Sequence, residues 1–504
     1  MLSVYAVSTV MGIPQRGDGI TLVRMKKRYL RRDFLKHSAL AAGAAAFPGS
    51  LVHSFATAQP PAQPIAPRPR FPTSDPAWQT TWDAALAVLA GNVRSMPRYE
   101  HPVLVEGSTY AGIWQECAPQ EGQVYGTLQR YIATPAGQPT PLQVARANHM
   151  AFFAQQKPDG QLPASIKLTD KVGTDQGYGQ IQMVVPIAAT AWDIFQLTDS
   201  KDEELLATAY RSCSLWDAWL RQYRDTRKTG LVEGFCTYDT GMDYSPRWTQ
   251  AGIPSRCPDA DARKFPPLPG MPRICPDLSA TVYGGRIALA AMAHALGKSD
   301  DHARWLADAE HIRHLILTKL YSPEDAAFYD LDTDNKFVRI RSVVTLRVLS
   351  EHVLDPHDSK DKAIFDDIWT RQIHNPKAFW APYPFPSSAL DEPTFVRPIP
   401  RNSWGGASQA LTALRAPRWM PYYGKQAELD HVMQQWCSAI MRHMQEAKGP
   451  AEQSKLFRQQ MDPLTGEFTG YEPPNAPPGG PQDPGGYSPA ALVFLDFARR
   501  LSKR

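Results

Sequence analysis

Apolar residues recur at three- and four-residue steps along most of the chain, the spacing that places them on one face of a helix. This pattern predicts helices over residues 141–156, 183–198, 203–223, 281–297, 303–320, 405–416, 425–446 and 488–501. Strand-like alternation is scarce, and residues 337–340 are its best example. The sequence has no repeat period, so we do not expect a simple helical solenoid. We therefore expect one all-α domain over residues 76–504, arranged as an α/α toroid whose paired helices ring a central cleft.

Long connections interrupt the helical pattern. Residues 231–280, 374–404 and 457–487 are rich in proline, glycine, aspartate and aromatic residues. Proline makes up 46 of the 504 residues, about 9%, against a typical ~5%. Long structured loops on a helical scaffold commonly carry function. We therefore expect the functional site to be built from these loops.

The first 58 residues have the features of an export signal. Arg31 and Arg32 form a twin-arginine motif, an apolar run follows at 39–47, and Ala-Thr-Ala at 56–58 fits a cleavage site. An amphipathic helix that begins with two arginines is the alternative. The apolar run is too short to remain as a membrane anchor. We expect residues 59–75 to be a proline-rich linker, and the protein to pass through the twin-arginine machinery into the periplasm or medium, with no membrane association after processing.

Charge and cysteine content argue against a nucleic-acid-binding protein, a disulfide-framework protein and a zinc protein. Residues 1–58 contain eight of the 54 basic residues and two of the 50 acidic ones, which leaves 46 basic and 48 acidic residues elsewhere. No basic stripe remains that would indicate a nucleic-acid partner. The six cysteines have neither a disulfide-framework pattern nor zinc-site spacing. Cys257 and Cys275 bracket a proline-rich loop, and the sequence leaves open whether a disulfide joins them.

Residues 241–248, Gly-Met-Asp-Tyr-Ser-Pro-Arg-Trp, carry the strongest local motif. They resemble the segment that holds the catalytic acid in glycoside hydrolase family 63, especially its mannosylglycerate hydrolase-like branch, and are similar to a trehalase segment. Other segments match the family in the same order: 275–283, 328–337, 379–393, 403–406, 462–467 and 485–488. The resemblance covers about residues 105–502. It implies an (α/α)6 barrel of the six-hairpin glycosidase type, acting on an α-linked sugar without a cofactor or metal.

Asp243 is the candidate general acid. Inverting hydrolysis needs a carboxylic acid that protonates the leaving oxygen and a carboxylate, about 6.5–9.5 Å away, that activates water. Apolar residues at 242, 244, 246 and 248 would raise the pKa of Asp243 and keep it protonated. Arg247 could oppose this shift by pairing with Asp243, or could bind a hydroxyl or carboxylate of the substrate. A helix cap or turn is the alternative role for Asp243.

The catalytic base is less evident from the sequence. In the family it is a glutamate three residues before an Asp-Pro pair, and the matching residue here is Gln459, whose amide is not basic. We expect Glu467, eight residues downstream on a turn, to fold back and replace it. The next candidates are Glu472, Glu116 and Glu121.

The sugar-recognition segment also departs from the family pattern. Where the family has an aromatic residue followed by Trp-Asp, residues 112–117 read Gly-Ile-Trp-Gln-Glu-Cys, so the recognition carboxylate is displaced or replaced. Gln182 matches a family glutamine that contacts substrate. Together with the aromatic residues, the resemblance predicts substrate contacts from Trp114, Gln182, Arg247, Trp248, Asp277, Trp404 and Tyr487.

These observations favour an exported glycosidase that cleaves an α-linked glycoside or oligosaccharide with inversion. A carbohydrate-binding barrel that has lost turnover is the alternative, because the family base position is Gln459. A lyase acting on uronic-acid polymers is a third interpretation, although no Tyr/His or Asn/His pair stands out.

Overall fold

The structure is a computed structural model that describes residues 67–96, 98–169, 176–243, 245–250, 252–265, 267–395, 403–469 and 485–502. Residues 63–504 form one structural unit. The predicted signal segment, residues 59–66 of the predicted linker, and Glu472 lie outside the described residues. The first described helix begins at Pro76.

Fourteen helices account for most of the described secondary structure. They are α1 (Pro76–Asn92), α2 (Ala118–Thr127), α3 (Pro141–Ala154), α4 (Ile187–Leu197), α5 (Glu203–Tyr223), α6 (Pro276–Ala295), α7 (Ser299–Leu315), α8 (Val344–Ser350), α9 (Ser359–Ile368), α10 (Ser403–Gly406), α11 (Ala410–Trp419), α12 (Gln426–Met444), α13 (Pro450–Gln453) and α14 (Ser488–Leu501).

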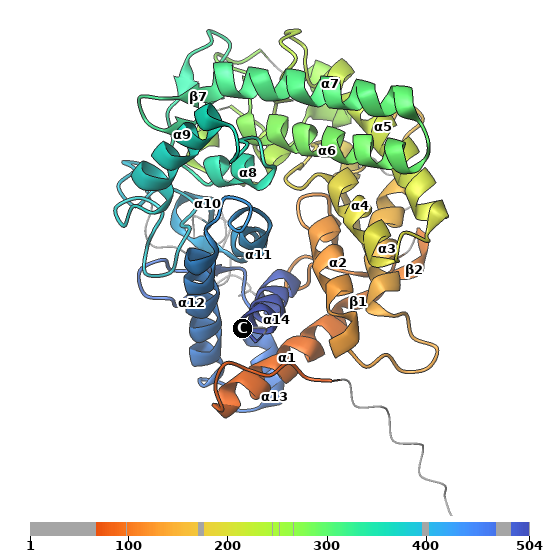
Figure 1. The fold of residues 1–504 in the computed structure, drawn as a ribbon, viewed down its shortest axis with the longest axis vertical. Helices are drawn as coiled ribbons and strands as arrows, with labels where there is room; N and C mark the ends of the chain where they lie inside the picture. Colours follow the sequence, from red (N-terminus) through yellow and green to blue (C-terminus); the bar gives the residue numbers. More distant parts are fainter. Residues whose placement is uncertain are drawn as a thin grey trace, which may run out of the picture. The chain divides into compact units, whose positions relative to one another are not determined.

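Six of these helices form a closed inner ring. Helix α2 contacts α4, and contacts continue in turn to α6, α8, α11 and α14, which returns to α2. Helices α1, α3, α5, α7, α9 and α12 lie outside this ring (Figure 1). Outer and inner helices pack in pairs, such as α3 on α2, α7 on α6, and both α1 and α12 on α14. The arrangement is an (α/α)6 barrel, and the predicted fold class is confirmed.

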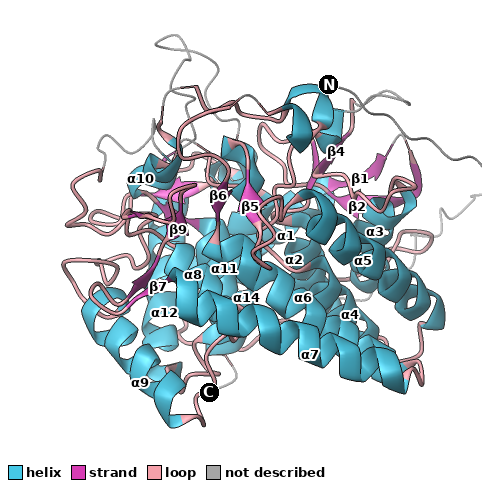
Figure 2. Cartoon of the chain, turned by 90° about the horizontal axis from the view of Figure 1, so that it is seen from above, coloured by secondary structure: helices cyan, strands magenta, loops and turns pink. Residues whose placement is uncertain are grey.

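Short antiparallel strands tie the loops together. They are β1 (Val93–Met96), β2 (Tyr99–Leu104), β3 (Gly112–Trp114), β4 (Ser165–Lys167), β5 (Glu233–Gly234), β6 (Arg273–Ile274), β7 (Tyr321–Ser322), β8 (Ala327–Phe328), β9 (Asp330–Leu331), β10 (Phe337–Val338), β11 (Ser408–Gln409), β12 (Gln460–Met461) and β13 (Phe468–Thr469). The largest sheet has the order β10-β9-β6-β5, and another has the order β11-β12-β13. Strands β4, β5, β6 and β9 lie toward one end of the helical ring (Figure 2).

Helical periodicity located most of the long helices and missed several others. Each predicted helix is present, although α6 begins at Pro276 and α7 ends in a π-helical turn, Ile316–Leu320. Helices α1, α2, α8 and α9 were not predicted. All seven residues of α8 and eight of the ten residues of α2 are buried, so neither sequence shows a polar face.

The buried face of each helix packs into one extended apolar core. Some polar groups inside it are paired, as expected for buried donors and acceptors. The ring of His149 on α3 lies 2.9 Å from the Ala145 carbonyl through Nδ1 and 2.8 Å from the Thr190 hydroxyl on α4 through Nε2. Burial lowers the pKa of His149 to about 4, so the imidazole is neutral.

Among the described residues, no helix is both long enough and apolar enough to cross a membrane.

Candidate active site

A cavity of about 370 Å³ opens among the loops. Its walls come from segments that are distant in sequence. They are Glu106, Thr109, Tyr110, Ala111, Trp114 and Glu116 before α2, Lys167, Thr169 and Gln182 before α4, Tyr238, Gly241, Asp243 and Arg256 before α6, Trp404 on α10, and Gln459 beside β12. Three carboxyl groups line it, those of Glu106, Glu116 and Asp243. Carboxyl groups that share a cavity with aromatic rings are the chemistry of a glycosidic cleavage site.

Burial in this cavity favours the protonated form of Asp243. Its side chain is partly buried, and Oδ1 is buried with no hydrogen-bond partner among the described residues. Burial raises the pKa of Asp243 well above its usual range, and the nearby Glu116 carboxyl raises it further. Arg256 and Arg347 act in the opposite direction and are outweighed. A carboxylic acid that stays protonated near neutral pH can donate its proton to a leaving oxygen.

Glu116 lies against the segment that carries Asp243. Gly241 has a φ of +58°, and a Cβ on this glycine would stand 2.4 Å from Glu116 Oε2. Gln182 Nε2 donates a hydrogen bond to the same oxygen at 2.7 Å, and Gln182 itself has a φ of +45°. Such backbone conformations are uncommon outside glycine and concentrate at functional sites. The structure therefore holds the Glu116 carboxyl in one position beside the Asp243 loop.

The environment of Glu116 differs from that of Asp243. Burial raises the pKa of Glu116 to about 7, while the Gln182 hydrogen bond and the Arg347 guanidinium limit the rise. Glu116 is thus about half ionised at neutral pH, and its carboxyl accepts a hydrogen bond from Gln182, whereas Asp243 Oδ1 has no partner among the described residues. Two carboxyl groups in different environments can act as acid and base in one reaction.

Glu106 and Gln459 occupy another part of the wall. Tyr487 donates its hydroxyl proton to Glu106 Oε1 at 2.8 Å, and Tyr110 donates to Gln459 Oε1 at 2.9 Å. Burial, together with the neighbouring carboxyl groups, raises the pKa of Glu106 well above its usual range. Gln459 therefore does line the cavity, as its place in the family pattern predicts, but it contributes an amide rather than a carboxylate.

Trp114 and Trp404 line the cavity, as predicted. The edge of Tyr110 packs on Trp114 with ring centroids 5.7 Å apart. Trp248 and Tyr487 do not line the cavity. Trp248 is buried and donates its indole N–H to Thr240 Oγ1 at 3.0 Å, and Tyr487 is fully buried behind Glu106. The structure therefore gives these two rings supporting positions instead of the predicted direct contact with sugar.

Arg247 and Asp277 also lie outside the cavity lining. Arg247 donates to Asp277 Oδ2 at 2.8 Å and to Asp330 Oδ2 at 2.8 Å, and all three side chains are buried. Burial alone would raise the pKa of Asp277, but the guanidinium of Arg247 lowers it below the usual value. Arg247 thus pairs with neither Asp243 nor an open substrate site. It fastens the Asp243 loop to the start of α6 and to β9.

Glu467 does not occupy the position that the sequence suggested. Its side chain is exposed and does not line the cavity. The backbone N–H groups of Asp462 and Gly466 donate to the carbonyls of Glu467 and Asp462, both at 2.9 Å, which closes a tight turn between β12 and β13. This turn keeps Glu467 on the surface, so the expected approach to Asp243 is wrong.

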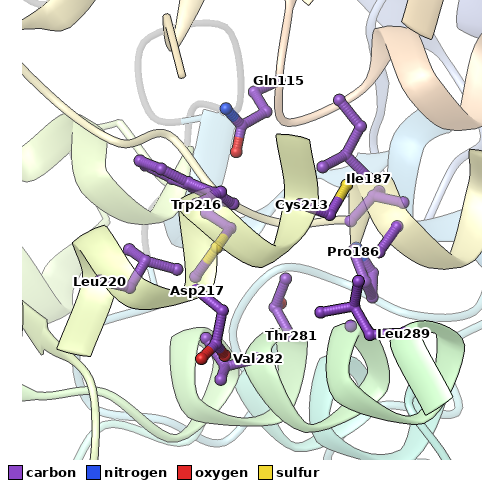
Figure 3. A pocket seen from close by; sticks show the side chains of 14 residues that line it. Gln115, Pro186, Ile187, Cys213, Trp216, Asp217, Leu220, Thr281, Val282 and Leu289 are labelled. Carbon is purple, nitrogen blue, oxygen red and sulfur yellow. The ribbon is translucent and has the colours of Figure 1, made fainter. Parts of the chain in front are cut away.

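The displaced recognition carboxylate has a structural explanation. Gln115 points into a second, apolar cavity of about 30 Å³ among Cys213, Trp216 and Leu289 (Figure 3). Gln115 Nε2 donates to the Pro163 carbonyl at 3.2 Å. This space is too small for a sugar ring. The next residue, Glu116, lines the 370 Å³ cavity, so a carboxyl group faces it one position later in the sequence, a shift that its place directly after Trp-Gln could have signalled.

Within the described part of the chain, three groups of side chains are close enough to hold a metal ion: Glu106–Glu116–Cys117, Cys236–Asp239–Cys257 and Cys275–Asp277–Asp330. In the last two an arginine already neutralises the aspartates, Arg224 in one and Arg247 in the other. In the first, Glu106 and Glu116 belong to the wall of the 370 Å³ cavity.

A ring of six helix pairs whose loops enclose an acid, a second carboxyl group and two tryptophans defines a glycoside hydrolase. Residues 139–479 match the family described as the mannosylglycerate hydrolase MGH1-like glycoside hydrolase domain, and the chain belongs to this family. No curated protein sequence matches the chain.

Solved structures show the same fold. The glycoside hydrolase family 63 mannosylglycerate hydrolase from Thermus thermophilus, in complex with Tris, is 17% identical with a TM-score of 0.59, and the match covers 82% of this chain and 99% of that one. Neutral trehalase from Saccharomyces cerevisiae is 13% identical with a TM-score of 0.54, over 83% of this chain and 81% of that one.

Proposed function

We propose that the protein is an exported enzyme that hydrolyses an α-linked glycoside with inversion, with Asp243 as the general acid and Glu116 as the general base. The observation that carries this proposal is the meeting of these two carboxyl groups in one cavity with Trp114 and Trp404. Asp243 protonates the leaving oxygen. Glu116, in its ionised form, removes a proton from the attacking water.

The substrate fits the cavity through its sugar ring and a polar aglycone. Trp114 and Trp404 offer flat apolar surfaces for the C–H face of a sugar, and Gln182 lies beside its hydroxyl groups. Lys167 and Arg256 also line the cavity. Two cationic side chains favour a substrate that carries a carboxylate. The similar structure from Thermus thermophilus is a mannosylglycerate hydrolase. Glycosides of hydroxy acids should therefore be the first substrates tested.

A screen of α-glycosides with three matched variants tests the mechanism. Asp243→Asn and Glu116→Gln should each lower kcat by about 10³-fold while KM changes little, because the lost interactions form in the transition state. Glu467→Gln changes the same functional group on the surface and should leave both constants unchanged. Azide should partly restore Glu116→Gln by acting as the nucleophile.

Full activity in Asp243→Asn would remove Asp243 from the proposed role. A large loss in Glu467→Gln together with an active Glu116→Gln would return the base to Glu467. Proton NMR of the first anomer released distinguishes inversion from retention without reference to any variant.

Export is proposed from the sequence of the first 58 residues. Replacing Arg31 and Arg32 by lysine in the full chain should stop its appearance in the periplasm, and N-terminal sequencing of the exported protein should begin at about residue 59. An unprocessed protein retained in the cytoplasm of a twin-arginine-competent host would contradict export.

Gln459 favours a second candidate function, a carbohydrate-binding barrel without turnover. It lines the cavity at the family's base position, and Tyr110 fixes its amide. This function predicts binding of an oligosaccharide in calorimetry with no product after long incubation. Release of free sugar that Asp243→Asn abolishes would exclude it.

A further inference from the structure

Cys236 and Cys257 lie together at the base of the loop that carries Asp243. Their sulfur atoms and one carboxylate oxygen of Asp239 are all within 4.8 Å of one another. Both cysteines are buried, at 0% and 4% exposed. With Phe235 and Ala262 they form a small apolar cluster that is separate from the main core. Neither cysteine is in a disulfide bond in the structure.

The backbone holds the two cysteine segments side by side. Thr237 N–H donates to the Pro254 carbonyl at 3.0 Å, and Tyr238 N–H donates to the Ser255 carbonyl at 3.3 Å. Cys257 N–H and the Cys236 thiol both reach the carbonyl of Gly179. The sulfur atoms are therefore neighbours because the loop closes at this point.

Cys275 is in a different environment from Cys257. Its sulfur is grouped with Asp277 and Asp330, and it contacts the Arg273 carbonyl at 3.5 Å. Among the described residues, the cluster around Cys236 is the one group that contains two sulfur atoms. The pairing of Cys257 with Cys275, which the sequence left open, is not the one that the structure brings together.

A metal ion fits this cluster poorly. Asp239 Oδ2 already accepts from the N–H groups of Phe235 and Cys236 at 2.7 and 3.2 Å and from the Arg224 guanidinium, and Oδ1 accepts from Ile181 N–H at 2.9 Å. Arg224 Nη2 also lies 3.9 Å from Cys257 Sγ. The aspartate therefore has little capacity left for a ligand bond, and the fixed positive charge repels a cation.

We propose that Cys236 and Cys257 form a disulfide bond that closes the loop bearing Asp243. In this step the two thiols lose two protons and two electrons, and one S–S bond forms. A small-molecule or protein disulfide accepts these protons and electrons and is reduced to two thiols. The bridge encloses residues 237–256, which include Gly241, Asp243 and Arg256 from the cavity wall. It stabilises the fold by restricting this loop in the unfolded chain, and it does not depend on the proposed hydrolysis.

Peptide mapping tests the bridge directly. The full chain is incubated with oxidised glutathione, both folded and during refolding from urea, which exposes buried thiols. It is then denatured, alkylated and digested with trypsin. The expected product joins peptide 229–247 to peptide 257–263, with four of the six cysteines alkylated before reduction and all six after it. Six alkylated cysteines in both states, or a Cys257–Cys275 linkage, would overturn the proposal.

Thermal unfolding separates the bridge from mere proximity. Reduction should lower the Tm of the oxidised protein by about 3 °C, as expected for one loop-closing disulfide in a domain of this size. Cys257→Ala should unfold at the Tm of the reduced protein and show no response to dithiothreitol, while Cys275→Ser should keep the response. If the protein treated with oxidised glutathione kept both thiols free and its Tm did not respond to reduction, the bridge would be contradicted, whether or not the protein cleaves glycosides.

Discussion

Replacing Gly241 by alanine should disable the site through Glu116. The new Cβ would stand 2.4 Å from Glu116 Oε2, and the nearest other atom, Val184 Cγ2, would be 3.0 Å away. Non-bonded contacts settle at about 3.5 Å, so the carboxylate must retreat by about 1 Å. It would then lose its 2.7 Å hydrogen bond from Gln182. A displacement of this size costs about 10²-fold in rate, or about 2.7 kcal/mol of transition-state stabilisation.

Backbone strain is a separate effect that a matched variant can subtract. Gly241 has a φ of +58°, where alanine costs about 1–2 kcal/mol. Gly137 has a φ of +80°, and a Cβ there would meet nothing within 4 Å. Gly137→Ala should therefore lower the stability in urea while kcat/KM stays at the wild-type value. If Gly241→Ala kept full kcat/KM and lost only as much stability as Gly137→Ala, the close approach to Glu116 would have no catalytic consequence.

Three further predictions concern charge. Asp330→Asn removes one partner of the buried Arg247, and urea unfolding should show a loss of about 3 kcal/mol; a change below about 0.5 kcal/mol would contradict the anchoring role. The pH profile of kcat/KM should rise through about 7 as Glu116 deprotonates and fall at higher pH as Asp243 loses its proton, and loss of the acidic limb in Glu116→Gln would identify its origin. His149, whose pKa falls from 6.5 to about 4 on folding, favours the native state above pH 6.5. Its contribution, about 3 kcal/mol, is lost as the pH falls from 6.5 to 4, so His149→Gln should flatten stability over this range.

Local sequence predicted the barrel because most of its helices expose one polar face. The buried helix α8 escaped, since Val344–Ser350 has no polar side for periodicity to detect. Sequence could place Asp243 in the cavity wall because its motif is contiguous. The substrate contacts expected of Arg247 and Trp248 were carried over from the same motif, and the structure shows that these side chains turn inward to hold it.

The remaining site residues depend on contacts between distant segments. Nothing near Glu116 in the sequence shows that Gly241, 125 positions later, would leave room for its carboxylate. The exposed position of Glu467 follows from hydrogen bonds within a turn that the sequence pattern suggested would fold over the cleft. Motif position could name Gln459 as a wall residue, but the residue that supplies the second carboxyl group lies on another loop.

The inner ring of helices can close only after α14 has been synthesised. Helix α14 contacts α1, α2, α11 and α12, and it leaves the ribosome after all four of them. Until then, the apolar sides of those helices that α14 will cover have no partner, so a nascent or C-terminally truncated chain offers them to chaperones and proteases. A stop codon near residue 487 should thus destabilise much more of the fold than α14 itself. Without α14, the inner ring is open, and both α2 and α11 lose a neighbouring helix.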